Sequence, residues 1–415
     1  MTNFTVAFLV ALAFMVAVRL WLASRQLGAL RRGAGSTPEP FRAAITAEEH
    51  RRAAEYSRAK LNLGRVELVA DTVALLGLTL GGGFAWLDAR VAALGLPPVA
   101  HGVAVLAAMM LGLTLWSLPY SIYSTFGIEA RFGFNRQTPP LFALDFVRSL
   151  ALGAALGLPL LALVLWLMQH TGTYWWAYAW AAWALFGIAL TALYPRFLAP
   201  LFNRFEPLGP GELRSRLERL VAACGFSADG LYVMDGSRRS THGNAYFTGI
   251  GRHKRIVLFD TLVSRLEAGE LEAVLAHELG HFRLNHVRVR LIMSLVTSAL
   301  GFALLGYASG QPELYGALGI RTPSMHAALA LFALVTPVFL FPLGPLSAWW
   351  SRRDEFAADR YAAEHASAAD LAAALVKLYR DNASTLTPDP VYSAWNDSHP
   401  PALARLAALD RLSRA

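Results

Sequence analysis

The segment whose residue types and spacing best suit catalysis is His277-Glu278-Leu279-Gly280-His281. On an α-helix, residues four apart lie one above the other, so both imidazoles can reach one Zn²⁺ at about 2.0–2.1 Å. Glu278 projects beside them and can take the proton of a zinc-bound water. The pattern predicts a zinc-dependent peptidase with one ion per chain, in which Glu278 is the general base.

The third zinc ligand must come from another segment, because a catalytic zinc has three protein ligands and one open position. A metzincin would have a histidine six residues after His281, but that position is Val287, which excludes the class. His286 rotates away from the pair and is expected to be a supporting or surface residue. The better candidate is Glu355, which shares a helical face with Asp359. One carboxylate can bind zinc while the other accepts the free ring N–H of a ligating histidine.

The elements that position these residues are expected to lie largely in lipid. Of the 415 residues, 55% are hydrophobic and 16% are charged, whereas soluble domains carry about 25% charge. A spanning helix needs about 20 apolar residues. Seven segments qualify: 4–22, 66–87, 102–122, 146–168, 175–193, 291–308 and 325–346. The single cysteine, Cys224, excludes an intramolecular disulfide and a Cys-rich zinc site.

Basic residues indicate the orientation. They gather between the first two spans and after the third, fifth and seventh, which places the N-terminus outside and the C-terminus in the cytoplasm. This distribution also explains the net charge of +8 without nucleic-acid binding. The domains are expected as a five-span domain (1–194), a first catalytic part (195–290), a transmembrane hairpin (291–346) and a second catalytic part (347–415). The zinc should lie at the cytoplasmic membrane face, in a water-filled cavity.

The two catalytic parts carry mixed secondary structure. Hydrophobic spacing predicts helices at 211–224, from about 269, at 349–379 and at 401–412, strands at 231–234, 245–249 and 255–259, a turn at 251–254 and a loop at 381–398. The expected fold is mainly α, a multi-pass membrane protein with seven transmembrane helices and a small α+β catalytic domain split by the last two spans.

The chain resembles the type I CAAX prenyl proteases, integral-membrane zinc metallopeptidases with seven spans. Shared segments run through nearly the whole chain, and include Ile128-Glu129, Gly133-Phe134-Asn135-Arg136, Tyr194-Pro195, Pro200-Leu201-Phe202-Asn203, Gly243-Asn244-Ala245-Tyr246-Phe247, Lys254-Arg255-Ile256-Val257-Leu258, Asp260-Thr261-Leu262, Ser351-Arg352, Glu355 with Asp359, and Ser398-His399-Pro400. The resemblance implies a zincin-like site inside a hollow chamber, with Glu355 as third ligand. It also implies that Asn244 and His399 hold the substrate and the developing oxyanion.

Physical arguments for these last two residues are independent of the resemblance. Asn244 opens a strand, with Ala245 and Tyr246, that can pair with an extended peptide by β-augmentation. His399 lies on a loop ahead of a helix, where a donor can be aimed at the scissile carbonyl. A purely structural role is the alternative for each.

The favoured function is a zinc endopeptidase that cuts near the C-terminus of lipidated, prenyl-CAAX-like or hydrophobic peptides or proteins. A membrane quality-control metalloprotease is the first alternative. The second is a seven-span transporter or receptor with a vestigial metal site, which would not need Glu278 or Glu355. The Ala-, Arg-, Leu- and Gly-rich composition suits a bacterial inner membrane; the endoplasmic reticulum is the eukaryotic equivalent.

Overall fold

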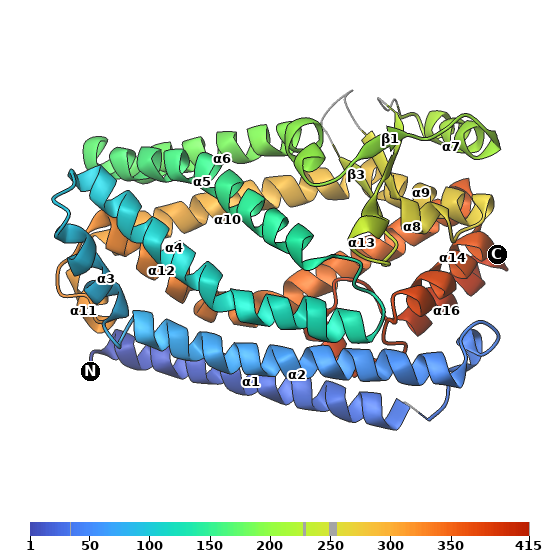
Figure 1. The fold of residues 1–415 in the computed structure, drawn as a ribbon, viewed down its shortest axis with the longest axis horizontal. Helices are drawn as coiled ribbons and strands as arrows, with labels where there is room; N and C mark the ends of the chain where they lie inside the picture. Colours follow the sequence, from blue (N-terminus) through green and yellow to red (C-terminus); the bar gives the residue numbers. More distant parts are fainter. Residues whose placement is uncertain (34, 227–229, 249–254, 415) are drawn as a thin grey trace.

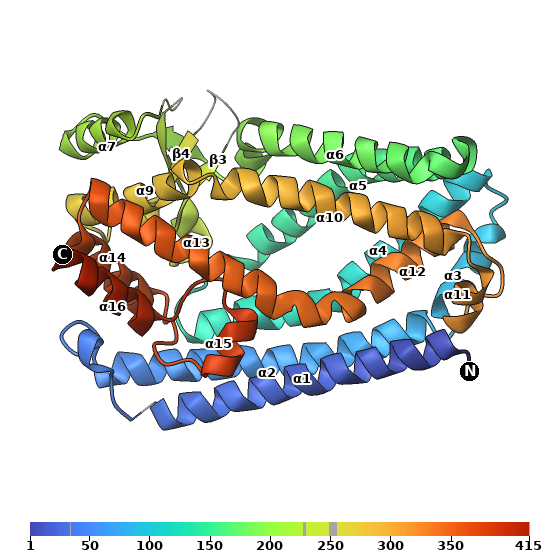
Figure 2. The same cartoon turned by 180° about the vertical axis from the view of Figure 1, so that it is seen from behind.

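The computed structural model describes residues 1–33, 35–226, 230–248 and 255–414, and most of them are helical. The long helices run either nearly parallel to the longest axis of the molecule or obliquely to it (Figures 1 and 2). They are α1 (Asn3–Gly33), α2 (Ala47–Leu78), α4 (Pro98–Ile122), α5 (Pro139–His170), α6 (Trp175–Leu193), α10 (His286–Ser309), α12 (Met325–Leu340) and α13 (Gly344–His365). Within the described residues, six stretches are long and apolar enough to cross a membrane, or seven if one bent helix pair counts as a span.

That bent pair lies where the second span was expected. The predicted helix at 66–87 is broken between α2 and α3 (Gly83–Ala92), whose axes differ by 53°. Gly82 has a φ of +76°, which favours glycine. A Cβ at Gly83 would lie 2.7 Å from the Gly77 carbonyl oxygen. Prediction of one continuous helix was therefore wrong, because glycines at the break allow a sharp change of direction.

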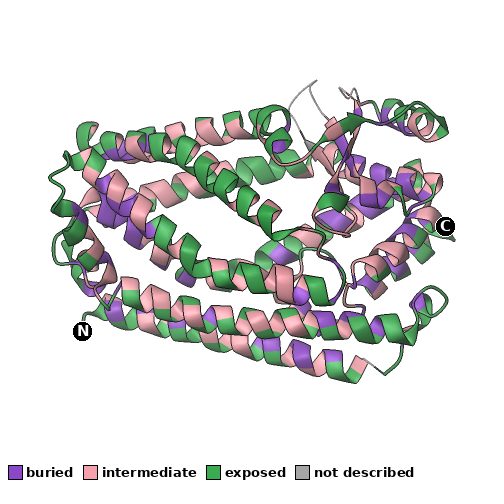
Figure 3. Ribbon diagram, viewed as in Figure 1, coloured by how far each residue is buried: buried purple, intermediate pink, exposed green. Residues whose placement is uncertain are grey.

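Buried apolar residues form two main cores at opposite ends of the molecule (Figure 3). One joins the strands to the helices at residues 212–223, 268–283, 344–365, 368–381 and 402–413. The other joins α1, α3, α4, α5, α6, α10, α11 (Pro312–Ala317) and α12. In the apolar stretches of α5, α6 and α10, only 11%, 6% and 6% of residues are buried. The buried residues of these three helices lie near one end of each helix.

A four-stranded sheet lies at one end of the molecule. Its strands are β1 (Phe205–Pro207), β2 (Leu231–Met234), β3 (Ala245–Thr248) and β4 (Arg255–Phe259), in the order β1-β2-β4-β3. The predicted strands at 231–234 and 255–259 are confirmed, and β1 was missed because it has only three residues. The strand predicted at 245–249 is confirmed as far as Thr248. Its last residue and the turn predicted at 251–254 lie outside the described residues.

Shorter helices surround the sheet, and the last three of them follow α13. They are α7 (Glu212–Ala223), α8 (Asp260–Val263), α9 (Ala268–Arg283), α14 (Ala368–Asp381), α15 (Pro390–Asn396) and α16 (Ala402–Ser413). The helix predicted at 349–379 is interrupted: α13 ends at His365, and Ser367 caps α14 by accepting a hydrogen bond from the Asp370 amide. The loop predicted at 381–398 contains α15, whose N-cap is Asp389.

Candidate metal centre

Helices α9 and α13 bring the predicted ligands together. A reciprocal capping box between Glu267 and Glu270 starts α9. Gly280 then permits close packing, because a Cβ there would lie 3.1 Å from Tyr361 Cβ and 3.2 Å from Ala358 Cα. The histidines of α9 consequently meet the face of α13 that carries Glu355.

The three predicted ligand atoms have the spacing that a zinc ion needs. His277 Nε2 lies 3.3 Å from His281 Nε2 and 3.5 Å from Glu355 Oε2, and His281 Nε2 lies 3.4 Å from Glu355 Oε1. Ligand atoms with bonds of 2.0–2.1 Å around a tetrahedral ion are about 3.3–3.4 Å apart. Glu355 Oε2 is also buried and makes no hydrogen bond of good geometry, although His399 Nδ1 lies 2.8 Å away. The donor set of two imidazoles and one carboxylate therefore fits Zn²⁺.

A buried carboxylate lies beside His277, the first of the predicted ligands. Asp359 Oδ1 lies 2.9 Å from His277 Nδ1, on the side of the ring opposite the ligand atom. Arg405 donates two hydrogen bonds to Asp359, with lengths of 2.9 Å and 2.5 Å. Both side chains are almost fully buried, with exposed fractions of 1% for Asp359 and 7% for Arg405. The pair fixes the carboxylate, which in turn orients the imidazole.

Arg405 was missed by the sequence reasoning, although a signal was present. It is buried on α16 together with Ala402, Leu406 and Leu409. These positions follow the helical spacing of an apolar face, where a lone arginine indicates a buried anionic partner.

His286 lies closer to the site than its position in an extended α9 would suggest. Helix α9 ends before Asn285, whose φ of +61° places it in the left-handed region. His286 then begins α10, and its Nδ1 lies 3.0 Å from His281 Nδ1. Asp354 stands 3.7 Å from His286 Nε2 and binds Arg290 at 3.1 Å. The break between α9 and α10 at Asn285 thus brings His286 into contact with the Nδ1 side of His281.

Burial and neighbouring charges shift the protonation of the site. Burial opposes a charge on His277, but the carboxylates of Asp359 and Glu355 outweigh this effect and raise the pKa of His277 to about 9. Burial raises the pKa of Glu278 above its ordinary value, and the neighbouring histidines offset this only in part. A carboxylate with a raised pKa is a better proton acceptor near neutral pH.

The predicted substrate-binding residues lie at the sheet edge and on a C-terminal loop. Ala245 and Tyr246 belong to β3, an edge strand that pairs on one side with β4. Asn244 is exposed just before β3, and its side-chain oxygen accepts a hydrogen bond from the Ala245 amide. His399 has a side chain that is 66% exposed, and its Nδ1 lies 2.8 Å from Glu355 Oε2.

A cavity of about 1230 Å³ adjoins these residues. Asn244 and His399 both line it, as do Lys60 and Asp71 of α2. The three candidate metal ligands are not among its lining residues. The cavity is thus a space beside the metal centre, bordered by two of the residues predicted to hold the substrate.

Two family models match the chain. One is described as the CAAX prenyl protease N-terminal region with five membrane helices and covers residues 26–204. The other is described as peptidase family M48 and covers residues 207–413. A CAAX prenyl protease 1 homolog of Arabidopsis thaliana is 38% identical over 325 residues, which is 76% of each chain. The homolog of Homo sapiens is 34% identical over 349 residues, covering 75% of this chain and 73% of that protein.

The similarity extends to the fold. The crystal structure of S. mikatae Ste24p matches with a TM-score of 0.90 and 31% sequence identity, over 99% of both chains. The sequence comparison and the structural comparison thus agree along almost the whole chain.

Proposed function

We propose a mechanism and a substrate class for this chain from the premise that it belongs to peptidase family M48, as a type I CAAX prenyl protease and a multi-pass zinc metalloprotease of the membrane. The observation that supports the mechanism best is the spacing of His277 Nε2, His281 Nε2 and the Glu355 carboxylate. These three residues would hold the ion, and Glu278 lies next to them on α9.

Each residue of the site has a separate task in this mechanism. A bound Zn²⁺ would act as a Lewis acid that makes water more acidic and polarises the scissile carbonyl. Glu278 accepts a proton from the attacking water and passes it to the leaving amine. His399 donates to the carbonyl oxygen as negative charge develops there. Asp359 accepts the Nδ1 proton of His277 and keeps the Nε2 atom free for the metal.

Glu278→Gln tests the assignment of the general base. Glutamine keeps the size of the side chain but cannot accept the proton, so peptidase activity should fall by about 10²–10⁴-fold. Zinc content should stay at the wild-type level, because Glu278 is not a proposed ligand. Full activity in a zinc-loaded Glu278→Gln protein would remove Glu278 from this role. His399→Gln, measured beside it, should lower kcat and leave the zinc content unchanged.

The proposed substrate is a peptide with a prenylated CAAX-like C-terminus, cut near that end. The names of the curated relatives support the prenyl-CAAX class. The exposed segment Asn244–Tyr246 is suited to bind an extended peptide through its main chain. Cleavage of a farnesylated peptide should exceed cleavage of its unlipidated twin. Equal cleavage of the two would favour the quality-control alternative instead.

The proposed topology has the N-terminus outside and both catalytic parts, 195–290 and 347–415, in the cytoplasm. The positions of the basic residues support it. The single cysteine, Cys224, is buried, so an introduced thiol can be labelled selectively. On intact cells, an impermeant thiol reagent should label Leu94→Cys, between α3 and α4, and spare Ser413→Cys. The reverse labelling pattern would invert the topology.

A further inference from the structure

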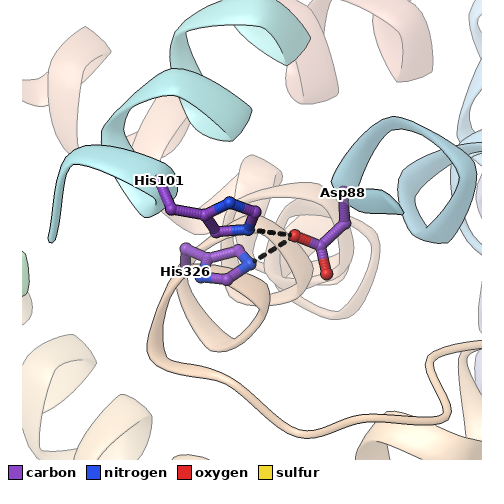
Figure 4. A group of neighbouring side chains, drawn as sticks. All are labelled: Asp88, His101 and His326. Carbon is purple, nitrogen blue, oxygen red and sulfur yellow. Dashed lines mark hydrogen bonds and ion pairs between the residues drawn. The ribbon is translucent and has the colours of Figure 1, made fainter. Parts of the chain in front are cut away.

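We propose that Asp88, His101 and His326 form a second zinc site, which fastens the end of the helical bundle far from the peptidase centre. The three residues come from α3, α4 and α12 (Figure 4). Figures 1 and 2 place α3 and the start of α12 at the opposite end of the long axis from α9 and α13's catalytic half. The site therefore shares no residue with the peptidase centre.

The ligand atoms already converge on one point. His101 Nε2 lies 2.6 Å and His326 Nε2 lies 2.9 Å from the same carboxylate oxygen, Asp88 Oδ1. Both rings turn their Nε2 atoms towards this oxygen (Figure 4). Around a tetrahedral zinc the ligand atoms would be about 3.3–3.4 Å apart, so each contact needs to widen by less than 1 Å. Two imidazoles and one carboxylate are a donor set that zinc favours.

A bound cation would also balance the negative charge of Asp88. Among the residues that the structure describes, its partners are the two imidazoles, and no lysine or arginine pairs with it. Arg90 is nearby in sequence, but its guanidinium lies over the Trp86 ring, 5.4 Å from the ring centre. The Asp88 side chain is only 28% exposed, and those of His101 and His326 are 16% and 11% exposed. A divalent ion would balance a carboxylate that water only partly solvates.

The backbone is shaped to bring these residues together. Gly102 follows His101, and a Cβ there would lie 3.1 Å from His326 Cβ and 3.0 Å from Leu165 Cδ1. Any larger residue would hold α4 away from α12. Ser324, the N-cap of α12, places its hydroxyl 3.1 Å from His326 Nε2, so an oxygen is present for the fourth position. The sharp bend before α3 directs Asp88 towards both histidines.

The role assigned to this ion is structural. Asp88 and His326 are 238 positions apart, so one ion would connect the second expected span, through α3, with the seventh. It would act beside the apolar core at that end of the molecule, which contains Phe84, Leu165 and Ala327. Because α5, α6 and α10 have few buried residues in their apolar stretches, a metal ion at this end would limit how far the helices separate.

The test is the zinc content of the full-length protein in detergent. Protein is equilibrated with Zn²⁺, freed of excess by gel filtration and measured by elemental analysis. Wild-type protein should retain two ions per chain, and His326→Gln and Asp88→Asn should each retain one. His170→Gln is the matched control and should retain two ions, because His170 is exposed and its ring contacts the Trp166 carbonyl rather than a carboxylate.

Activity identifies which ion is lost. The Asp88→Asn protein with one ion should keep its peptidase activity, since the remaining ion occupies the catalytic centre. Wild-type protein with a single ion per chain would overturn the proposal, and this measurement does not depend on any variant folding. Two ions retained in both Asp88→Asn and His326→Gln would overturn it as well. Asparagine has the same shape as aspartate, so Asp88→Asn tests the proposal even if His326→Gln does not fold.

Discussion

Asp359→Asn should show how much the metal centre depends on its supporting carboxylate, because it removes one negative charge and keeps the shape of the side chain. Asparagine leaves the Arg405 guanidinium buried, with an exposed fraction of 7% and with Glu355 Oε2, 3.8 Å away, as its remaining anionic partner. Breaking a buried ion pair from one side costs about 3–5 kcal/mol. The distant Glu355 offsets part of this loss, so the free energy of unfolding should fall by about 3 kcal/mol.

The same substitution should weaken zinc binding. His277 Nδ1 loses the carboxylate that lies 2.9 Å away, and with it the preference for presenting a free Nε2 atom to the metal. Loss of such a supporting partner lowers metal affinity by about 10–100-fold. The removed negative charge acts in the same direction, because it attracted the cation. Competition with a chelator of known affinity measures this change, and chemical denaturation of metal-free protein measures the stability.

Two further variants make the test specific. Asp410 lies on α16 and forms an exposed ion pair with Arg414. Asp410→Asn breaks that pair and should change the free energy of unfolding by less than about 1 kcal/mol. Asp359→Asn combined with Arg405→Met removes both buried charges and should recover most of the lost stability. The reasoning is refuted if Asp359→Asn binds zinc within about threefold of wild type, or if the double variant is as unstable as the single one.

Three other predictions concern the contact between α9 and α13, the cap of α14 and the choice of metal. Gly280→Ala should lower activity at least about tenfold, because its Cβ would lie 3.1 Å from Tyr361 Cβ and push α9 away from α13. The control is Gly157→Ala, whose Cβ would meet nothing within 4 Å and which should match wild type in the same assay. Ser367→Ala should lower the free energy of unfolding by about 1 kcal/mol, through loss of the α14 cap, as measured by denaturation. Chelation should abolish peptidase activity, and Zn²⁺ but not Mg²⁺ should restore it, because a site with two imidazoles disfavours Mg²⁺.

Local patterns in the sequence were sufficient to predict most of the helices and strands. The 3.6-residue period placed His277, Glu278 and His281 on a helix, which is confirmed as α9. Two predicted strands match β2 and β4 residue for residue. The length of the apolar segments predicted most of the long helices, because a membrane imposes a minimum length on each. The zinc-protease family was predicted from motifs along the whole chain and is confirmed.

Contacts between distant segments depended on the tertiary structure. Glu355 lies 74 positions beyond His281, and helical spacing could nominate it but could not place it 3.4 Å from that ring. The contact of Arg405 with Asp359 depends on how α16 packs on α13. The cluster of Asp88, His101 and His326 has no local signature, since its members are scattered along the chain. Periodicity reports which face of one helix is apolar, whereas the meeting of two helices is decided by glycine contacts, bends and core packing that involve the entire chain.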